Sequence, residues 1–289
     1  LKPTVVIRIG DPPVSKVVNQ WLARCGAEQI AVTQQPTLID PDKIVTTHMV
    51  GSFNELFIEM SRGTQAKPET EWISAWKVCE RKARTALDTR FSESNQLTEP
   101  LCAVTVSESL EPGSNLVVSS SMPVRDLEWF APARDGVRVF SNRGVNGIDG
   151  VVSTAVGVAL SSKAPTALLI GDIAMLHDSN GMLNLTRRDV HMKFIIVDNE
   201  GGGIFSFLPQ AESLDGAQFE QLFGTPHSVD FESLAKTHGI PFAWVTTADD
   251  LRRELGNSGT SIIGVRTDRK LNVDHHNALY TAVAEALTR

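Results

Sequence analysis

The sequence predicts an α/β protein with a doubly wound, six-stranded parallel sheet, helices on both faces, and a partial second α/β domain before it. Short apolar runs with the length and β-branched content of buried strands recur along the chain and alternate with helical patterns. Such strands, separated by helices, are typical of a parallel sheet covered on both sides. The 289 residues, 42% of them hydrophobic, are enough for a sizeable core.

Residues 1–65 have the pattern of half a doubly wound unit, which is small for a domain by itself. Apolar runs predict strands at 4–10, 29–33 and 44–50, and helical spacing predicts helices at 15–26 and 52–60. A linker and connecting helix follow over residues 66–91, with the helix at 70–91. The chain thus begins with part of an α/β domain.

Residues 92–289 carry the pattern of a complete sheet. Strands are expected at 116–120, 137–141, 166–172, 194–199, 242–245 and 261–265. Helices are expected at 101–110, from 122 onward, and at 151–161, 177–186, 219–223, 230–238, 248–255 and 272–287.

Composition excludes several classes of protein. The net charge of -7 argues against nucleic acid as the main partner. Three widely spaced cysteines predict buried thiols in a reducing compartment, and the cluster His275-His276 is expected at the surface. No run of 18 apolar residues or signal peptide is visible, so we predict a cytoplasmic protein without a membrane span. The start at Leu1 suggests the C-terminal part of a longer protein.

Two strand ends predict a metal site. The strand at 166–172 ends in Gly171-Asp172, and the strand at 194–199 ends in Asp198-Asn199 before Glu200-Gly-Gly-Gly203. Parallel strands bring these ends to one edge, where ligands bind in open α/β sheets. Magnesium takes oxygen ligands, which Asp172, Asn199 and the Gly201 carbonyl offer, and the glycines admit a diphosphate. The alternative is two ordinary strand-to-loop turns.

The same edge collects positive charge. Ser119-Ser-Ser121 with Arg125 follows one strand, and Asn142-Arg143 follows another. Arg125 lies in the first turn of its helix, where the macrodipole adds to its charge. A lone exposed arginine is often just solvated, but two at this edge indicate a site for anions beside a metal. The glycine-spaced turn at 144–150 is weak evidence for phosphate binding, because the Rossmann fingerprint is not matched.

These motifs also carry a family resemblance. Gly171-Asp172 followed about 27 residues later by Asn199 resembles the cofactor signature of thiamine-diphosphate-dependent enzymes, although Ile173 and Asp198 depart from it. Longer motifs resemble the MenD family, the 2-succinyl-5-enolpyruvyl-6-hydroxy-3-cyclohexene-1-carboxylate (SEPHCHC) synthases of menaquinone biosynthesis. They are Ser119-Ser-Ser-Met-Pro-Val-Arg-Asp126, Ser141-Asn-Arg-Gly-Val-Asn-Gly-Ile-Asp-Gly150, His177-Asp-Ser-Asn-Gly181 and Asp198-Asn-Glu-Gly-Gly-Gly-Ile-Phe205. The resemblance covers most of residues 92–289, a diphosphate-binding domain, and residues 1–65 resemble the end of the family's central domain.

The resemblance implies thiamine diphosphate as cofactor, anchored by Mg2+ or Mn2+ on Asp172, Asn199 and the Gly201 carbonyl. It implies that Arg125, Arg143 and Ser121 bind the substrates or intermediates. Residues implied at the cofactor are Ile148, which wedges between its rings, and Asn146, Gly171, Asp172, Asn199, Gly201, Gly202, Ile204 and Phe205.

The implied activity is that of a transferase. Such an enzyme decarboxylates 2-oxoglutarate and adds the resulting succinyl-semialdehyde carbanion to isochorismate. The family's N-terminal pyrimidine-binding domain, which supplies the activating glutamate from a partner subunit, is absent from this sequence. We therefore expect the chain to be inactive alone and to function in a homodimer or homotetramer.

Three other interpretations stay open. Another thiamine enzyme, of the acetolactate synthase or keto-acid decarboxylase type, would keep the metal ligands without needing two arginines. A nucleotide-binding module on the same fold would bind a nicotinamide nucleotide independently of metal. A non-catalytic interaction domain would bind neither.

Overall fold

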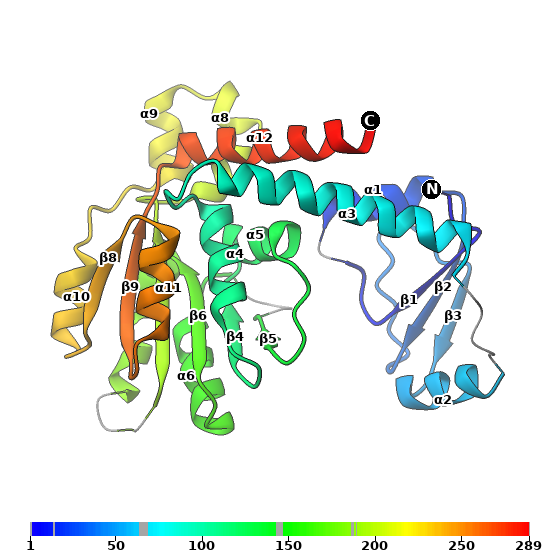
Figure 1. Ribbon diagram of the computed structural model, residues 1–289, viewed down its shortest axis with the longest axis horizontal. Helices are drawn as coiled ribbons and strands as arrows, with labels where there is room; N and C mark the ends of the chain where they lie inside the picture. Colours follow the sequence, from blue (N-terminus) through cyan, green and yellow to red (C-terminus); the bar gives the residue numbers. More distant parts are fainter. Residues whose placement is uncertain are drawn as a thin grey trace. The chain divides into compact units, whose positions relative to one another are not determined.

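The computed structural model describes residues 2–13, 15–63, 69–142, 147–185, 188 and 190–288 (Figure 1). The chain divides into two compact units, Leu1–Arg81 and Lys82–Arg289. The division falls within one long helix, α3 (Glu71–Ser92), in the segment assigned to the connecting helix.

The first unit contains a three-stranded parallel sheet in the order β1-β2-β3. Its elements are β1 (Val5–Ile9), α1 (Lys16–Arg24), β2 (Glu28–Thr33), β3 (Thr47–Val50) and α2 (Phe53–Gly63). The third strand is shorter than predicted, because the backbone N–H groups of Ile44 and Val45 donate to the Asp40 carboxylate instead of to a neighbouring strand.

The second unit contains the predicted six-stranded sheet, with all neighbouring strands parallel and in the order β5-β4-β6-β7-β9-β8. The strands are β4 (Asn115–Val118), β5 (Arg138–Phe140), β6 (Thr166–Gly171), β7 (Met192–Asp198), β8 (Phe242–Val245) and β9 (Ser261–Arg266). The predicted fold class is therefore confirmed.

Helices connect these strands. They are α4 (Glu99–Ser109), α5 (Met122–Phe130), α6 (Val151–Ser162), α7 (Asp172–His177), α8 (Gln210–Ser213), α9 (Gly216–Phe219), α10 (Phe231–Thr237), α11 (Ala248–Gly256) and α12 (Arg269–Thr288). Short 3-10 turns form η1 (Ser179–Asn184) and η2 (Gly203–Phe207), and η3 (Glu220–Gly224) is a π-helical turn. No helix in the described part of the chain is long and apolar enough to cross a membrane.

Alternate side chains of the central strands form two cores. On β6, Leu168 and Ile170 pack with helices α6 and α10, whereas Ala167 and Leu169 pack with α4 and α11 on the opposite face. Figure 1 shows α4 and α11 over the same face of the sheet. Both faces are thus covered, as the continuous apolar strands predict.

The strand order reverses between β4 and β6. The chain passes from β4 outward to β5, and then returns across the sheet to β6 on the other side of β4. Connections that leave two neighbouring strands in opposite directions open a crevice at their carboxyl ends, which is where open α/β sheets bind ligands. Here that point lies between Ser119, which follows β4, and Gly171, the last residue of β6.

Three expectations were wrong. The helix predicted at 177–186 is replaced by α7, which begins directly at Asp172, and by η1, so Asp172 opens a helix and does not end a strand. His276 is buried in α12 and not at the surface, although His275 is exposed. All three cysteines are free, but Cys102 is buried while Cys25 and Cys79 are only partly so.

Candidate functional site

A cavity of about 500 Å3 lies at the carboxyl edge of the sheet, at the reversal between β4 and β6. Its lining includes ten residues that the sequence analysis assigned to the site: Ser121, Arg125, Ile148, Gly171, Asp172, Asn199, Gly201, Gly202, Ile204 and Phe205. The fold thus brings together residues from the ends of four strands, β4, β5, β6 and β7. Two further assigned residues, Arg143 and Asn146, lie outside the described part of the chain.

Asp172 is the most constrained acid of this cavity. It is 2% exposed, at the first position of α7. Its Oδ1 accepts from the N–H of Ile173 at 2.6 Å, and its Oδ2 accepts from the N–H of Gly201 at 2.8 Å. The second bond joins the end of β6 to the loop after β7. Two oxygens offer about four acceptor positions, so capacity remains for a cation.

The loop after β7 needs its glycines. Gly201 has a φ of +146°, and a Cβ there would lie 1.9 Å from the carbonyl oxygen of Gly224. At Gly203 a Cβ would lie 2.5 Å from Nδ2 of Asn199. The glycines therefore let this backbone pass close to Asn199 and to the η3 segment. The Gly201 carbonyl accepts from the N–H of Gly203 at 2.9 Å and keeps a second lone pair.

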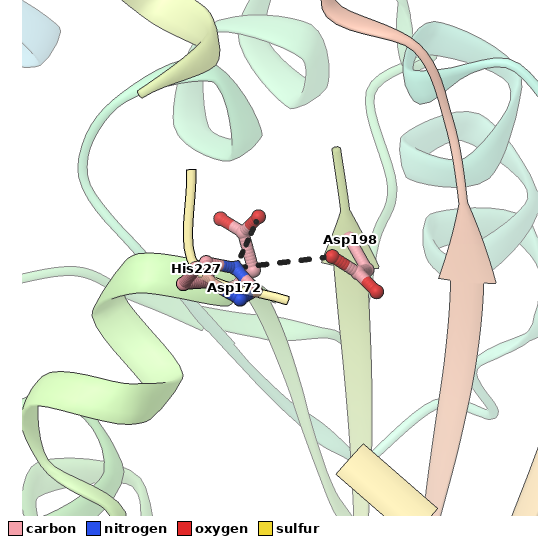
Figure 2. Close-up of side chains that lie close together, drawn as sticks. All are labelled: Asp172, Asp198 and His227. Atoms are coloured by element: carbon pink, nitrogen blue, oxygen red, sulfur yellow. Dashed lines mark hydrogen bonds and ion pairs between the residues drawn. The ribbon is translucent and has the colours of Figure 1, made fainter. Parts of the chain in front are cut away.

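His227 is a functional candidate that the sequence analysis missed. Its Nε2 lies 3.1 Å from Asp172 Oδ2 and 4.0 Å from Asp198 Oδ1 (Figure 2). Its Nδ1 accepts the backbone N–H of Val229 at 3.0 Å, so in the neutral ring the hydrogen is on Nε2 and is donated to Asp172.

Asp172, Asp198 and His227 together resemble a metal site, since their ligand atoms lie within 4.8 Å of one another. The tautomer of His227 argues against it as a ligand, because a protonated Nε2 has no lone pair to give. Asp198 is buried, and burial raises the pKa of its carboxyl, with the charge of Asp172 adding to the effect. It lines a second cavity of about 1020 Å3, which Asn199 and Glu200 also line. His227 thus orients Asp172 instead of completing a metal site.

Asn199 carries the clearest sign of a missing ligand. Its Nδ2 donates to Glu99 Oε1 at 2.8 Å. Its Oδ1 is buried and accepts no hydrogen bond from any described residue. A buried amide oxygen without a donor costs about 1–3 kcal/mol, so such an atom indicates a site for a water molecule or an ion.

The donor set fits a hard divalent cation. A carboxylate with spare acceptor capacity, a buried amide oxygen without a donor and a glycine carbonyl are the oxygen ligands that Mg2+ and Mn2+ take. All three residues line the same cavity. The remaining coordination positions would then be free for phosphate oxygens or water.

Arg125 supplies positive charge at the same cavity. It lies in the first turns of α5, and its Nη1 donates to the Ser121 carbonyl at 2.6 Å. Ser121 has a φ of +77°, a conformation that is strained for a residue with a side chain. Strain of this kind concentrates at functional sites, and here it sets the entry of the chain into α5.

Behind the cavity lies a buried group of ionisable residues. Glu99 is 3% exposed; burial, with the charge of Asp126 adding to it, raises the pKa of Glu99 to about 7. Asp126 Oδ1 and His276 Nε2 are 2.6 Å apart, and Nδ1 of His276 donates to the Asn272 carbonyl at 2.8 Å. Burial raises the pKa of Asp126, whereas the hydrogen bond and charge of Asp126 outweigh the burial of His276 and raise its pKa.

Local sequence patterns gave no signal for His227 or Glu99. His227 lies 55 residues from Asp172, and Glu99 lies 100 residues from Asn199. Neither is part of a periodic pattern, and Glu99 precedes the helix predicted at 101–110. Only the folded chain brings them to the strand ends.

The chain is similar to known proteins of one enzyme class. Residues 127–261 match the family model described as thiamine pyrophosphate enzyme, C-terminal TPP binding domain. A SEPHCHC synthase of Myxococcus xanthus is 40% identical over 291 residues, which cover 99% of this chain and 49% of that protein. A SEPHCHC synthase of Bacillus velezensis is 36% identical over an alignment of 301 residues, which covers 100% of this chain and 50% of that protein.

A solved structure shares the fold. It is that of a protein from Mycobacterium smegmatis described as a thiamin diphosphate-dependent enzyme, with a TM-score of 0.61 and 16% identity, over 92% of this chain and 48% of that one. The chain spans about half the length of the curated relatives it matches. The chain is therefore similar, as its motifs predict, to about half of the SEPHCHC synthases, and residues 127–261 are similar to the C-terminal domain of thiamine pyrophosphate enzymes.

Proposed function

We propose that the carboxyl-edge cavity binds the diphosphate end of thiamine diphosphate through a divalent cation, Mg2+ or Mn2+. Asp172, the amide oxygen of Asn199 and the Gly201 carbonyl would hold the cation. The observation that carries this proposal is the buried Oδ1 of Asn199, which lacks a donor among the described residues at a cavity that Asp172 and Gly201 also line.

The glycine loop and the remaining assigned residues support the same ligand. Gly171, Gly202, Ile204 and Phe205 line the cavity without adding charge, and Ile148 is a branched apolar side chain at its wall. An apolar wall beside a polar metal end suits a cofactor with two aromatic rings and a diphosphate. Asn146 is included in the proposal by resemblance alone.

The proposed activity is that of a SEPHCHC synthase, a transferase of menaquinone biosynthesis. When bound, thiamine diphosphate supplies the electron sink for decarboxylating a 2-oxo acid. The substrates would be 2-oxoglutarate and isochorismate, both dicarboxylates. Arg125, together with Arg143, would pair with their carboxylates, because a guanidinium fork binds a carboxylate bidentately. Ser121 would add a hydroxyl next to Arg125.

A partner subunit would complete the proposed enzyme. By the family resemblance, we propose that the activating glutamate of a pyrimidine-binding domain comes from a partner subunit in a homodimer or homotetramer. The 289-residue chain would bind the cofactor's diphosphate end and show no turnover by itself. A cytoplasmic location remains a prediction.

A thermal-shift experiment tests the proposal. Thiamine diphosphate with Mg2+, at 100-fold over its dissociation constant, should stabilise the chain by about 2.7 kcal/mol. Asp172→Ala should abolish the shift, whereas Asp178→Ala, which changes an aspartate outside the cavity, should retain it. A wild-type chain that gains no stability from the pair would contradict the proposal.

Two alternatives give different results, one in the thermal shift and the other in an activity assay. A nucleotide-binding module would be stabilised by a nicotinamide nucleotide without Mg2+. In the complete enzyme, a thiamine enzyme of the acetolactate synthase type would keep its activity on a neutral keto acid after Arg125→Ala. The SEPHCHC assignment predicts that Arg125→Ala raises the KM for 2-oxoglutarate.

A further inference from the structure

A second carboxyl group, outside the proposed cation ligands, lies at the cavity. Glu99 is the first residue of α4, is 3% exposed and is part of the cavity wall. It bonds to Asn199, which is 100 residues away at the end of β7. A buried carboxyl group is costly unless it has a specific partner, so its contacts indicate what it does.

Unlike a carboxylate, the amide of Asn199 has two orientations that differ in whether they can bind a cation. The two ends of its amide have nearly the same shape, but Oδ1 can bind a cation and Nδ2 cannot. A rotation of half a turn about the last side-chain bond would place the amide hydrogens against the cation. Something must select the productive orientation.

Glu99 makes that selection possible. Its Oε1 accepts a hydrogen bond from Asn199 Nδ2 at 2.8 Å, which leaves Oδ1 on the other arm of the amide, buried and without a described donor. The reverse orientation would bring Oδ1 against Oε1, two acceptors at hydrogen-bond distance. The preference holds for a carboxylate and for a carboxylic acid whose carbonyl oxygen faces Asn199.

A third residue holds Glu99 in turn. The hydroxyl of Thr267 donates to the same Oε1 at 3.0 Å, and the N–H of Thr267 donates to the Asp198 carbonyl at 2.9 Å. Glu99 therefore joins the start of α4 to the chain after β7 and after β9. The acceptor that faces Asn199 is fixed from two sides.

We propose that Glu99 is a positioning residue that turns the amide oxygen of Asn199 toward the cation. The inference rests on the proposed metal site and adds the residue that sets the identity of its amide ligand atom. Outer partners of metal ligands act in this way, and their loss typically costs about 10- to 100-fold in metal affinity.

The test is a titration of the 289-residue chain with Mn2+ in the presence of thiamine diphosphate, followed by electron paramagnetic resonance of the free ion. Glu99→Ala should weaken Mn2+ binding about 10- to 100-fold. Glu99→Gln keeps an acceptor oxygen for Asn199 and should restore the affinity. Glu108→Ala, the matched control, removes an exposed glutamate of the same helix and should leave Mn2+ affinity close to that of the wild type.

The same substitution in an Asn199→Asp background separates loss of the amide orientation from general loosening of the metal site. In Asn199→Asp both arms are oxygens, so orientation no longer matters, and Glu99 now faces another carboxyl group. There Glu99→Ala should leave Mn2+ affinity unchanged or improve it. An equal loss in both backgrounds, or wild-type affinity for Glu99→Ala with an intact circular dichroism melt, would overturn the inference. No Mn2+ binding by the wild-type chain would instead overturn the proposed function and the inference with it.

Discussion

The buried pair of Asp126 and His276 allows a quantitative test of the packing behind the cavity. The two side chains are 2% and 0% exposed, and their facing atoms are 2.6 Å apart. His276→Leu keeps a side chain of similar size but removes the partner of a buried carboxyl group. We expect the free energy of unfolding of the second unit to fall by about 3–5 kcal/mol, the usual cost of breaking a buried pair.

Two controls establish the cause. Asp126→Ala/His276→Leu removes both polar groups at nearly constant total volume and should recover most of the loss, because no unpaired carboxyl group remains. Arg252→Leu breaks the Arg252–Asp249 pair, which is 2.9 Å long with side chains 46% and 73% exposed, and should cost less than about 1 kcal/mol. Urea denaturation monitored by circular dichroism measures all three.

The pair also predicts a pH dependence with a definite sign. The raised pKa of His276 means that its stabilisation is fully present below pH 6.5 and is lost as pH rises through the higher pKa of the folded state. The raised pKa of Asp126 acts in the same direction, since the folded chain holds that proton more tightly. Unfolding free energy should therefore fall with rising pH above 6.5, less so in the double variant. A His276→Leu variant that loses no more free energy of unfolding than Arg252→Leu would contradict this role of the pair. Equal pH slopes of the unfolding free energy in the wild type and the double variant would also contradict it.

Two smaller predictions concern the backbone around the cavity. Gly201→Ala should abolish the stabilisation by thiamine diphosphate and Mg2+, because the new Cβ would lie 1.9 Å from the Gly224 carbonyl oxygen. Gly216→Ala, where a new Cβ has nothing within 4 Å, should retain the stabilisation. Thermal shift measures both variants, and a retained shift in Gly201→Ala would contradict the loop geometry. Ser121→Gly should raise the melting temperature of the unliganded chain by relieving about 1–2 kcal/mol of strain at φ +77°, and a lower melting temperature would show that the hydroxyl matters more.

Much of the fold could be predicted because its signals are local. The strands β6 and β7 are buried on both faces, so their sequences are continuous apolar runs such as Thr166-Ala-Leu-Leu-Ile-Gly171. The parallel order then places their carboxyl ends at one edge, which is why Asp172 and Asn199 could be paired in advance. The resemblance added residues, such as Ile148, that no local pattern singles out.

The errors have two different causes. The helix predicted at 177–186 begins at Asp172 instead, because the chain turns directly from β6 into α7 and continues as a 3-10 turn. His276 was expected in solvent because a His-His pair near Asp274 is polar in sequence. In the fold it faces Asp126 and packs against the ring of Phe130, with ring centroids 5.4 Å apart.

The outer partners of the proposed cation ligands could not be predicted. Glu99 and His227 reach Asn199 and Asp172 only through contacts between segments that are 100 and 55 residues apart in the chain. A hydrogen bond of that sequence separation leaves no trace in periodicity or spacing. Their roles follow from distances and from the direction of each donor, which only the folded chain provides.

The central claim is that one cavity at the carboxyl edge binds thiamine diphosphate through a cation on Asp172 and Asn199. Isothermal titration of the wild-type chain with thiamine diphosphate, with Mg2+ and then with EDTA, tests it most directly. We expect binding that requires Mg2+ and disappears in Asp172→Ala. Binding of equal affinity in EDTA, or an Asp172→Ala variant that binds as well as the wild type, would contradict it.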